Sequence, residues 1–154
     1  MYYYINIGSN LGDRRMNLSR AVSEIEKRFG WFELSKAVES EPWGFESPHK
    51  FLNIGMVFVS DKKPEEILDI LQEIERKLSP KPHRNADGSY ADRLLDIDIM
   101  AAEVYDPATD TSSLVRLDSE RLTLPHPHLE DRPFFLEPFK NLLETMSQMR
   151  ANGV

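Results

Sequence analysis

Residues 51–60 read Phe-Leu-Asn-Ile-Gly-Met-Val-Phe-Val-Ser, an apolar and β-branched stretch that predicts a strand. On its N-terminal side, apolar residues recur at helical spacing over residues 14–29, and a glycine that favours helix ends follows them. Residues 2–7 (Tyr-Tyr-Tyr-Ile-Asn-Ile) predict an earlier strand, which ends in the turn-forming run at residues 8–12. A further strand is expected over residues 31–39 and a loop over residues 40–50.

On the C-terminal side of residues 51–60 a helix and a strand follow again. Pro64 suits the first turn of a helix that extends to Leu78, and residues 94–100 predict a fourth strand. Between them, residues 79–92 contain two prolines, a glycine and almost no apolar residue, which predicts a long loop. After residue 100 we expect a polar stretch, a short strand over residues 121–124 and a helix from about Pro138. The inward-facing residues of that last helix would be Leu142, Leu143 and Met146.

The order of elements through residue 100 is therefore β-α-β-β-α-β. This order predicts an α+β fold of the ferredoxin-like type, with a C-terminal extension of a short strand and a helix. The chain has 154 residues, the length of one domain, and we expect residues 1–154 to form it. The fold class alone does not decide the chemistry, because this architecture carries many functions.

The composition excludes several classes of protein. The chain contains no cysteine, which rules out disulfides, thiolate metal sites and cysteine nucleophiles and fits a reducing compartment. No apolar run approaches the ~18 residues of a membrane helix, and the N-terminus lacks the basic region of a signal peptide. The 19 basic residues against 26 acidic ones give a net charge of -7, which disfavours nucleic-acid binding because that affinity comes from neutralising phosphates. We therefore expect a cytoplasmic monomer that acts on small molecules.

Two carboxylates stand out in the run Leu95-Asp-Ile-Asp-Ile99. Because side chains alternate along a strand, Asp96 and Asp98 would share one face while the aliphatic residues fill the core. Their stems would be about 6.6 Å apart, so their oxygens could converge on one hard cation or hold two Mg²⁺ ions. The alternative is that the pair simply forms the solvent-exposed face of an amphipathic strand.

Cations and imidazoles flank this acidic strand in an otherwise acidic chain. They are Lys81, His83, Arg84, Arg93, Arg121, His126, His128 and Arg132. Phosphate transfer needs such a set around a metal, although each residue alone could be an ordinary surface side chain. The chain has no P-loop sequence and no sign of a Ser-His-Asp triad. His126 and His128, without a cysteine or a third histidine at ligand spacing, make a poor zinc site.

Four ordered motifs resemble those of the 6-hydroxymethyl-7,8-dihydropterin pyrophosphokinase family. They are Gly8-Ser-Asn-Leu-Gly12, Phe51-Leu-Asn53, Arg93-Leu-Leu-Asp-Ile-Asp-Ile-Met100, and Arg121-Leu-Thr-Leu-Pro-His-Pro-His128 with Arg132-Pro-Phe134. The resemblance covers residues 2 to about 140. It implies transfer of pyrophosphate from ATP to 6-hydroxymethyl-7,8-dihydropterin in folate biosynthesis, with release of AMP.

The resemblance also implies roles for individual residues. Asp96 and Asp98 would bind two Mg²⁺ ions and, with Arg93, form the catalytic set. The pterin would be held by Phe51 and Phe134 on its faces and by Asn53 and the backbone near Ser40, Pro42 and Trp43 at its edges. The residues expected at ATP are Gln72, Glu75, Arg84, Tyr90, Arg93, Ile99, Arg121, Thr123, His126 and Arg132. The loop of residues 79–92 would close over both substrates.

The chain departs from the family pattern before the acidic strand. Tyr90-Ala-Asp-Arg93 replaces the usual Trp-Gly-Pro-Arg, so Asp92 adds a negative charge near the phosphates. Pro127 stands where some members place an aromatic residue. Two other functions stay open: a Mg²⁺-dependent nucleotidyltransferase, which would release pyrophosphate instead of AMP, and a non-enzymatic ferredoxin-like module that binds a ligand.

Overall fold

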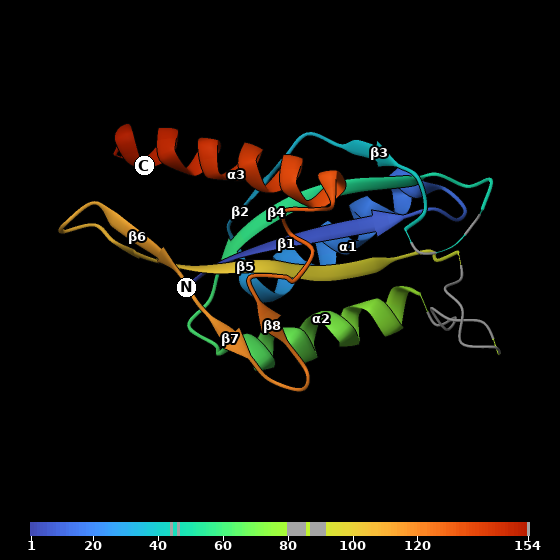
Figure 1. The fold of residues 1–154 in the computed structure, drawn as a ribbon, viewed down its shortest axis with the longest axis horizontal. Helices are drawn as coiled ribbons and strands as arrows, with labels where there is room; N and C mark the ends of the chain where they lie inside the picture. Colours follow the sequence, from blue (N-terminus) through green and yellow to red (C-terminus); the bar gives the residue numbers. More distant parts are fainter. Residues whose placement is uncertain (44, 46, 80–85, 87–91, 154) are drawn as a thin grey trace.

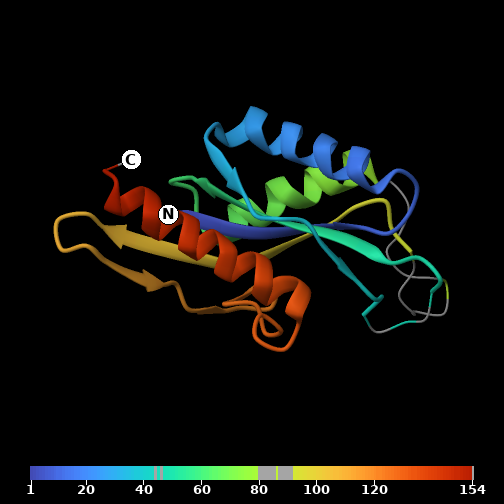
Figure 2. The same ribbon diagram turned by 90° about the horizontal axis from the view of Figure 1, so that it is seen from above.

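One antiparallel sheet separates two helices on one face from a third helix on the other (Figures 1 and 2). The structure is a computed structural model that describes residues 1–43, 45, 47–79, 86 and 92–153. The main sheet has the order β2-β4-β1-β5-β6, with β3 also paired to β4, and a separate ribbon joins β7 to β8. The elements are β1 (Tyr2–Ser9), α1 (Arg14–Phe29), β2 (Phe32–Leu34), β3 (Val38–Ser40), β4 (Phe51–Val59), α2 (Pro64–Leu78), β5 (Asp96–Asp106), β6 (Thr111–Leu114), β7 (Leu117–Asp118), β8 (Thr123–Leu124) and α3 (Pro133–Ala151). The chain therefore has the α+β class expected from its sequence.

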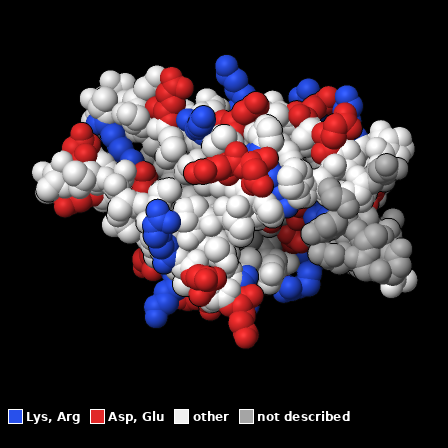
Figure 3. Space-filling model, viewed as in Figure 1, with Lys and Arg blue, Asp and Glu red and all other residues white. Residues whose placement is uncertain are grey.

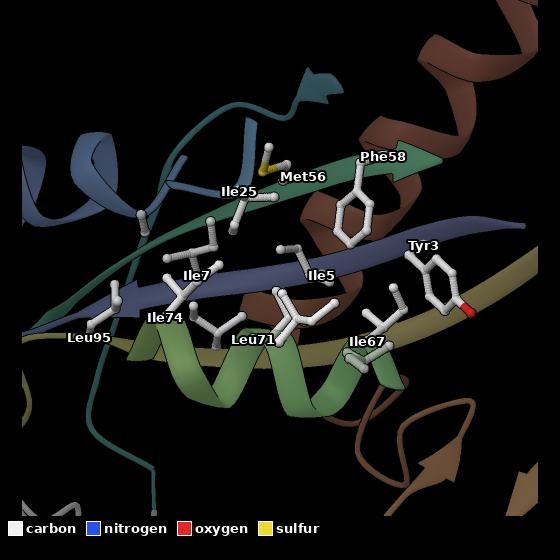
Figure 4. Packing of buried hydrophobic residues seen from close by; sticks show 14 of the residues in the cluster. Tyr3, Ile5, Ile7, Ile25, Met56, Phe58, Ile67, Leu71, Ile74 and Leu95 are labelled. Atoms are coloured by element: carbon white, nitrogen blue, oxygen red, sulfur yellow. The ribbon is translucent and has the colours of Figure 1, made fainter. Parts of the chain in front are cut away.

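The larger hydrophobic core lies between the sheet and helices α1 and α2 (Figure 4). Ile5 and Ile7 of β1 pack here with Ile25 of α1 and with Ile67 and Leu71 of α2, and all of them are almost fully buried. Both helices have the bounds that their periodicity predicts. Asp13 caps the first by accepting a hydrogen bond from the backbone N–H of Met16, and Pro64 opens the second.

A second core lies between the opposite face of the sheet and α3. Tyr4, Val57, Met100 and Ala101 of the sheet pack against the helix residues Phe135, Phe139, Leu142 and Met146. Gly55 allows this close approach, since a Cβ there would lie 2.9 Å from Cβ of Pro138 and 3.0 Å from Leu142. Because helices cover both faces, β1 and β4 are buried along nearly their whole length.

The expected start of the last helix near Pro138 is wrong, because α3 begins at Pro133 and contains Pro138. A proline inside a helix leaves the carbonyl four residues earlier without its N–H donor. Here that carbonyl belongs to Phe134, and Nδ2 of Asn6 on β1 donates to it over 2.8 Å. The helix therefore continues through the proline because the sheet satisfies the freed carbonyl.

The single strand expected over residues 31–39 is also wrong, since β2 and β3 are separate. Between them, the backbone N–H of Gly55 donates to Oγ of Ser35 (2.7 Å). In a continuous strand, the acceptor at this place would be a backbone carbonyl. The backbone N–H of Lys36 donates to Oδ1 of Asn141 on α3 (3.0 Å). Ser35 still donates its backbone N–H to the carbonyl of Gly55 (2.9 Å), and the chain leaves the sheet after this residue until β3 begins at Val38.

The fourth strand is longer than residues 94–100, and the stretch after it is not only polar coil. Strand β5 runs to Asp106 and turns back into β6, and β7 then precedes β8. On the face seen in Figure 3, acidic and basic side chains are interspersed. Within the described ranges, no helix combines the length and apolarity that crossing a membrane requires.

Candidate active site

Two cavities meet at the N-terminal end of β5. The first has a volume of about 300 Å³ and is lined by Asn6, Gly8, Glu41, Trp43, Phe45, Phe51, Asn53, Arg93, Asp96, Asp98, His126, His128, Arg132, Phe134 and Phe135. The second has a volume of about 370 Å³ and is lined by Leu68, Gln72, Glu75, Asp96, Ile97, Asp98, Ile99, Ser119, Glu120, Arg121, Leu122, Thr123, His126 and Pro127. Asp96, Asp98 and His126 line both cavities.

The pairing of β5 with β1 places the two carboxylates. Asp96 lies opposite Gly8 and Asp98 lies opposite Asn6, while Ile97 and Ile99 are buried in the core. Gly8 keeps the space beside the pair open, because a Cβ there would lie 3.0 Å from Oδ1 of Asn53. The alternation of the strand therefore sends both carboxylates to the two cavities, as the sequence predicts.

Excess negative charge is concentrated at this junction. Burial, together with the charges of Asp96 and Glu75, raises the pKa of Asp98 well above its usual value. Burial, followed by the charge of Asp96, raises the pKa of Glu75 to about 8, although its Oε2 accepts the backbone N–H of Ile97 (2.8 Å). Nη1 of Arg93 lies 2.9 Å from Oδ2 of Asp96 and offsets part of that charge. The site favours a cation.

The donors at the junction fit magnesium. Carboxylate oxygens are the protein ligands that Mg²⁺ prefers, and it usually takes one or two of them together with substrate phosphates and water. Among the described residues, no three histidine or acidic side chains are grouped as a complete metal cage. A pair of carboxylates whose charges repel each other fits an ion that arrives with a phosphate substrate.

His126 is a neutral hydrogen-bond donor at the junction. Burial, with the nearby positive charge of Arg132, lowers the pKa of His126 to about 4. Its Nδ1 accepts the backbone N–H of His128 (3.0 Å), so the single proton of the neutral ring is on Nε2. His126 can therefore donate from Nε2 to a ligand oxygen in either cavity.

Aromatic side chains dominate the far wall of the first cavity. Phe51, Trp43 and Phe134 line it, and the Arg132 guanidinium lies 4.7 Å from the Trp43 ring centre. Asn53 is almost fully buried and donates from Nδ2 to the carbonyl of Val38 (3.2 Å) and to Oγ of Ser40 (2.9 Å). Both amide protons are thus used within the protein, which leaves the Oδ1 of Asn53 as the atom suited to accept from a ligand.

The structure brings most of the predicted site residues together. The first cavity gathers the expected pterin residues Trp43, Phe51, Asn53 and Phe134. The second gathers the expected nucleotide residues Gln72, Glu75, Ile99, Arg121 and Thr123. Arg93 and Arg132, which the resemblance assigns to ATP, line the first cavity beside Asp96 and Asp98.

The other predicted residues lie in a third cavity or outside the described residues. Ser40 and Pro42 line a separate cavity of about 350 Å³ that shares Glu41, Trp43 and Phe134 with the first, and Oγ of Ser40 contacts the first cavity's Asn53. Arg121, which lines the second cavity, also forms an ion pair with Asp69 of α2. Lys81, His83, Arg84 and Tyr90, with most of the expected mobile loop, lie outside the described residues.

Sequence reasoning missed several residues of the site. Asn6 shares the face of Asp98 across the β1–β5 pair, and the period-two alternation of residues 2–7 could have shown this. Asn10, in the Gly-Ser-Asn turn after β1, is buried and bonded to the segment before β5. Phe45 and Glu41 come from the loop before β4, where the sequence carries no signal for which side chains turn inward.

Comparison with known proteins agrees with this geometry. The sequence model of the family described as 7,8-dihydro-6-hydroxymethylpterin-pyrophosphokinase (HPPK) matches residues 4–144. A 2-amino-4-hydroxy-6-hydroxymethyldihydropteridine pyrophosphokinase of Porphyromonas gingivalis is 42% identical over 140 residues, which cover 90% of this chain and 88% of the relative. Proteins of the same name from Aquifex aeolicus and Bacillus subtilis are 30% and 27% identical and cover 88% and 94% of this chain, or 76% and 80% of their own lengths. With its two cavities joined at a pair of aspartates, the chain belongs to the 7,8-dihydro-6-hydroxymethylpterin-pyrophosphokinase family.

Proposed function

We propose that this protein transfers the pyrophosphoryl group of ATP to the hydroxymethyl group of 6-hydroxymethyl-7,8-dihydropterin, with release of AMP. The observation that carries the proposal is the pair of cavities that share Asp96, Asp98 and His126. Among the described residues, the first cavity is lined by Phe and Trp rings and the second by none, so a flat heterocycle and a nucleotide can lie with their reacting ends at the shared edge. Family membership supports the same two substrates.

The aromatic cavity would hold the pterin. Phe51 and Phe134 offer ring faces for stacking, an arrangement worth about 0.5–1.5 kcal/mol beyond the area that each ring buries. The Oδ1 of Asn53 would accept an N–H from the edge of the heterocycle. A buried acceptor of this kind discriminates strongly, because a ligand without the matching donor leaves it unsatisfied.

The second cavity would hold ATP. It lies between α2, which contributes Gln72 and Glu75, and the segment of residues 119–127. The β5 residue Ile99 supplies an apolar wall between them, and Arg121 and Thr123 lie on the outer side. The triphosphate would point toward Asp96 and Asp98, since these are the residues that the two cavities have in common.

Enzymes of this family use ATP with Mg²⁺, and we propose that Asp96 and Asp98 hold two such ions. When bound, Mg²⁺ supplies positive charge that neutralises the phosphate oxygens. The pKa of Asp98 is raised first by burial and then by the charges of Asp96 and Glu75, and a cation at the same place would relieve that repulsion.

The protein's own groups would position the reactants and stabilise charge. Arg93, beside Asp96, and Arg132, over Trp43, present guanidinium groups at the shared edge, where phosphate charge moves during transfer. The Nε2–H of neutral His126 would donate to a phosphate oxygen. We assign no general base, since positioning and electrostatic stabilisation account for most of the catalysis of phosphoryl transfer.

Product analysis tests the proposal. The protein would be incubated with ATP, Mg²⁺ and the reduced pterin alcohol, and we expect AMP and the pterin diphosphate. Release of pyrophosphate would indicate a nucleotidyltransferase, and no consumption of ATP would indicate a binding module. The variant Asp98→Ala should lose turnover while staying folded by circular dichroism. Turnover that stayed Mg²⁺-dependent in this variant would remove Asp98 from the metal site.

Five further properties are proposals of the same kind. The strand order β2-β4-β1-β5, antiparallel throughout, supports a ferredoxin-like topology. We propose that residues 1–154 form one domain and that the protein is a cytoplasmic monomer that binds no nucleic acid. Limited proteolysis, cell fractionation, size-exclusion chromatography and a nucleic-acid binding assay would test these four statements.

A further inference from the structure

A buried asparagine joins three segments of the active-site wall. Asn10, which is 2% exposed, donates from Nδ2 to the carbonyl of His49 (3.1 Å) and to Oδ1 of Asp92 (2.8 Å). Its Oδ1 accepts the backbone N–H of Arg93 (2.8 Å), and its own backbone N–H donates to the carbonyl of Arg93 (3.1 Å). One residue therefore holds both backbone hydrogen-bonding groups of Arg93.

Asp92 helps to decide which way the Asn10 amide points. An ionised carboxylate only accepts hydrogen bonds, so the side of the amide that faces Asp92 must be Nδ2. This orientation turns Oδ1 toward the N–H of Arg93. A hydrogen bond to a charged acceptor is stronger than one to a neutral partner, so Asp92 is the stronger of the two acceptors at Nδ2.

The two carboxylate oxygens of Asp92 have different partners. One carboxylate oxygen bonds Asn10, and the other lies 3.8 Å from Nε2 of His49 in the segment before β4. Arg93, the next residue, has its guanidinium 2.9 Å from Oδ2 of Asp96 and 6.0 Å from the ring centre of Phe51. The backbone that Asn10 fixes is thus the base of a side chain that reaches both the acidic pair and the aromatic wall.

We infer that Asp92 is a positioning residue for the transfer reaction, which acts through Asn10 to fix the backbone of Arg93 and so to aim its guanidinium at the shared edge. The inference rests on the proposed function for its kinetic consequence. Asp92 is not among the residues that line either cavity.

The first test is kinetic. Asp92→Ala should lower kcat about tenfold and leave the KM values for ATP and pterin within about threefold, because a misdirected Arg93 affects the transition state more than binding. Asp92→Asn, which keeps an acceptor without the charge, should lose less. The matched control is Asp61→Ala, which removes an exposed aspartate just beyond the opposite end of β4 and should not change kcat.

The route through Arg93 is tested by a double variant. If Asp92 acts only through Arg93, the variant Asp92→Ala Arg93→Ala should be no slower than Arg93→Ala alone. The inference would be overturned if the losses in kcat of the two single variants multiplied in the double variant. It would also be overturned if kcat of Asp92→Ala stayed within twofold of the wild type.

Hydrogen exchange gives a readout that does not depend on activity. In Asp92→Ala the Arg93 amide should exchange at least about tenfold faster, because its acceptor, Oδ1 of Asn10, is no longer held in place. In Asp61→Ala it should exchange at the wild-type rate. An unchanged rate would refute the link between Asp92 and Arg93 even if the wild-type protein makes AMP. Conversely, a wild-type protein that makes no AMP would refute the proposed function and leave the exchange result to decide the link. Should Asp92→Ala fail to fold, Asp92→Asn supplies the same comparisons.

Discussion

At the scale of single residues, Asn53 shows how one side chain serves both the fold and the site. Its Nδ2 bonds the carbonyl of Val38 and Oγ of Ser40 on β3, and its Oδ1 is left for a ligand. The residue therefore fixes the short strand β3 against β4 and presents an acceptor of known orientation in the aromatic cavity.

Two substitutions separate these roles. Asn53→Ala should weaken pterin binding by about 1–3 kcal/mol, because the ligand loses a buried partner, and should change ATP binding much less. Ser40→Ala removes one bond that orients the amide but keeps Oδ1, so its effect on pterin binding should be smaller. Isothermal titration with each ligand measures both. Equal losses for pterin and ATP in Asn53→Ala would place Asn53 outside the pterin site.

At the scale of elements, the sequence predicted what depends on neighbours in the chain. Helices α1 and α2 have their expected bounds because periodicity, a capping aspartate and an N-terminal proline are local signals. The Asp-Ile-Asp alternation placed Asp96 and Asp98 correctly for the same reason. The start of α3 was mispredicted because the donor that replaces the missing N–H of Pro138 is Asn6, on the first strand. The break between β2 and β3 likewise depends on Asn141 of α3, which no local pattern reveals.

The bond between Asn6 and α3 can be tested by restoring the helical donor. Asn6→Ala leaves the partly buried carbonyl of Phe134 without its partner and should cost about 1 kcal/mol of unfolding free energy. Pro138→Ala returns a backbone N–H to that carbonyl, so Asn6→Ala Pro138→Ala should be more stable than Asn6→Ala alone. Urea denaturation of the four proteins gives the coupling energy. A double variant with the summed losses of its parents would contradict this account of why the helix passes through Pro138.

At the scale of the whole molecule, the two ends of α3 have different tasks. Its N-terminal turn supplies Phe134 and Phe135 to the first cavity, and its C-terminal turn is held to the sheet by a buried ion pair. Nη2 of Arg150 lies 2.6 Å from Oε1 of Glu103, which also accepts the hydroxyl of Tyr4 (3.0 Å). Burial and the charge of Glu103 raise the pKa of Tyr4, so this hydroxyl stays protonated and able to donate. The candidate site and the anchoring ion pair thus lie at opposite ends of one helix.

This separation predicts that the anchor can be changed without changing the chemistry. Glu103→Gln leaves the mostly buried guanidinium of Arg150 without its counter-charge and should lower the unfolding free energy by about 3–5 kcal/mol. Replacing all three partners, as in Tyr4→Phe Glu103→Leu Arg150→Met, should recover most of that loss, since the apolar set leaves neither a buried charge nor a buried hydroxyl without its acceptor. Thermal melts give the stabilities, and kcat at a temperature where every variant is folded should equal that of the wild type. A fall in kcat without a change in melting temperature would mean that the anchored end of α3 also sets the geometry of the site.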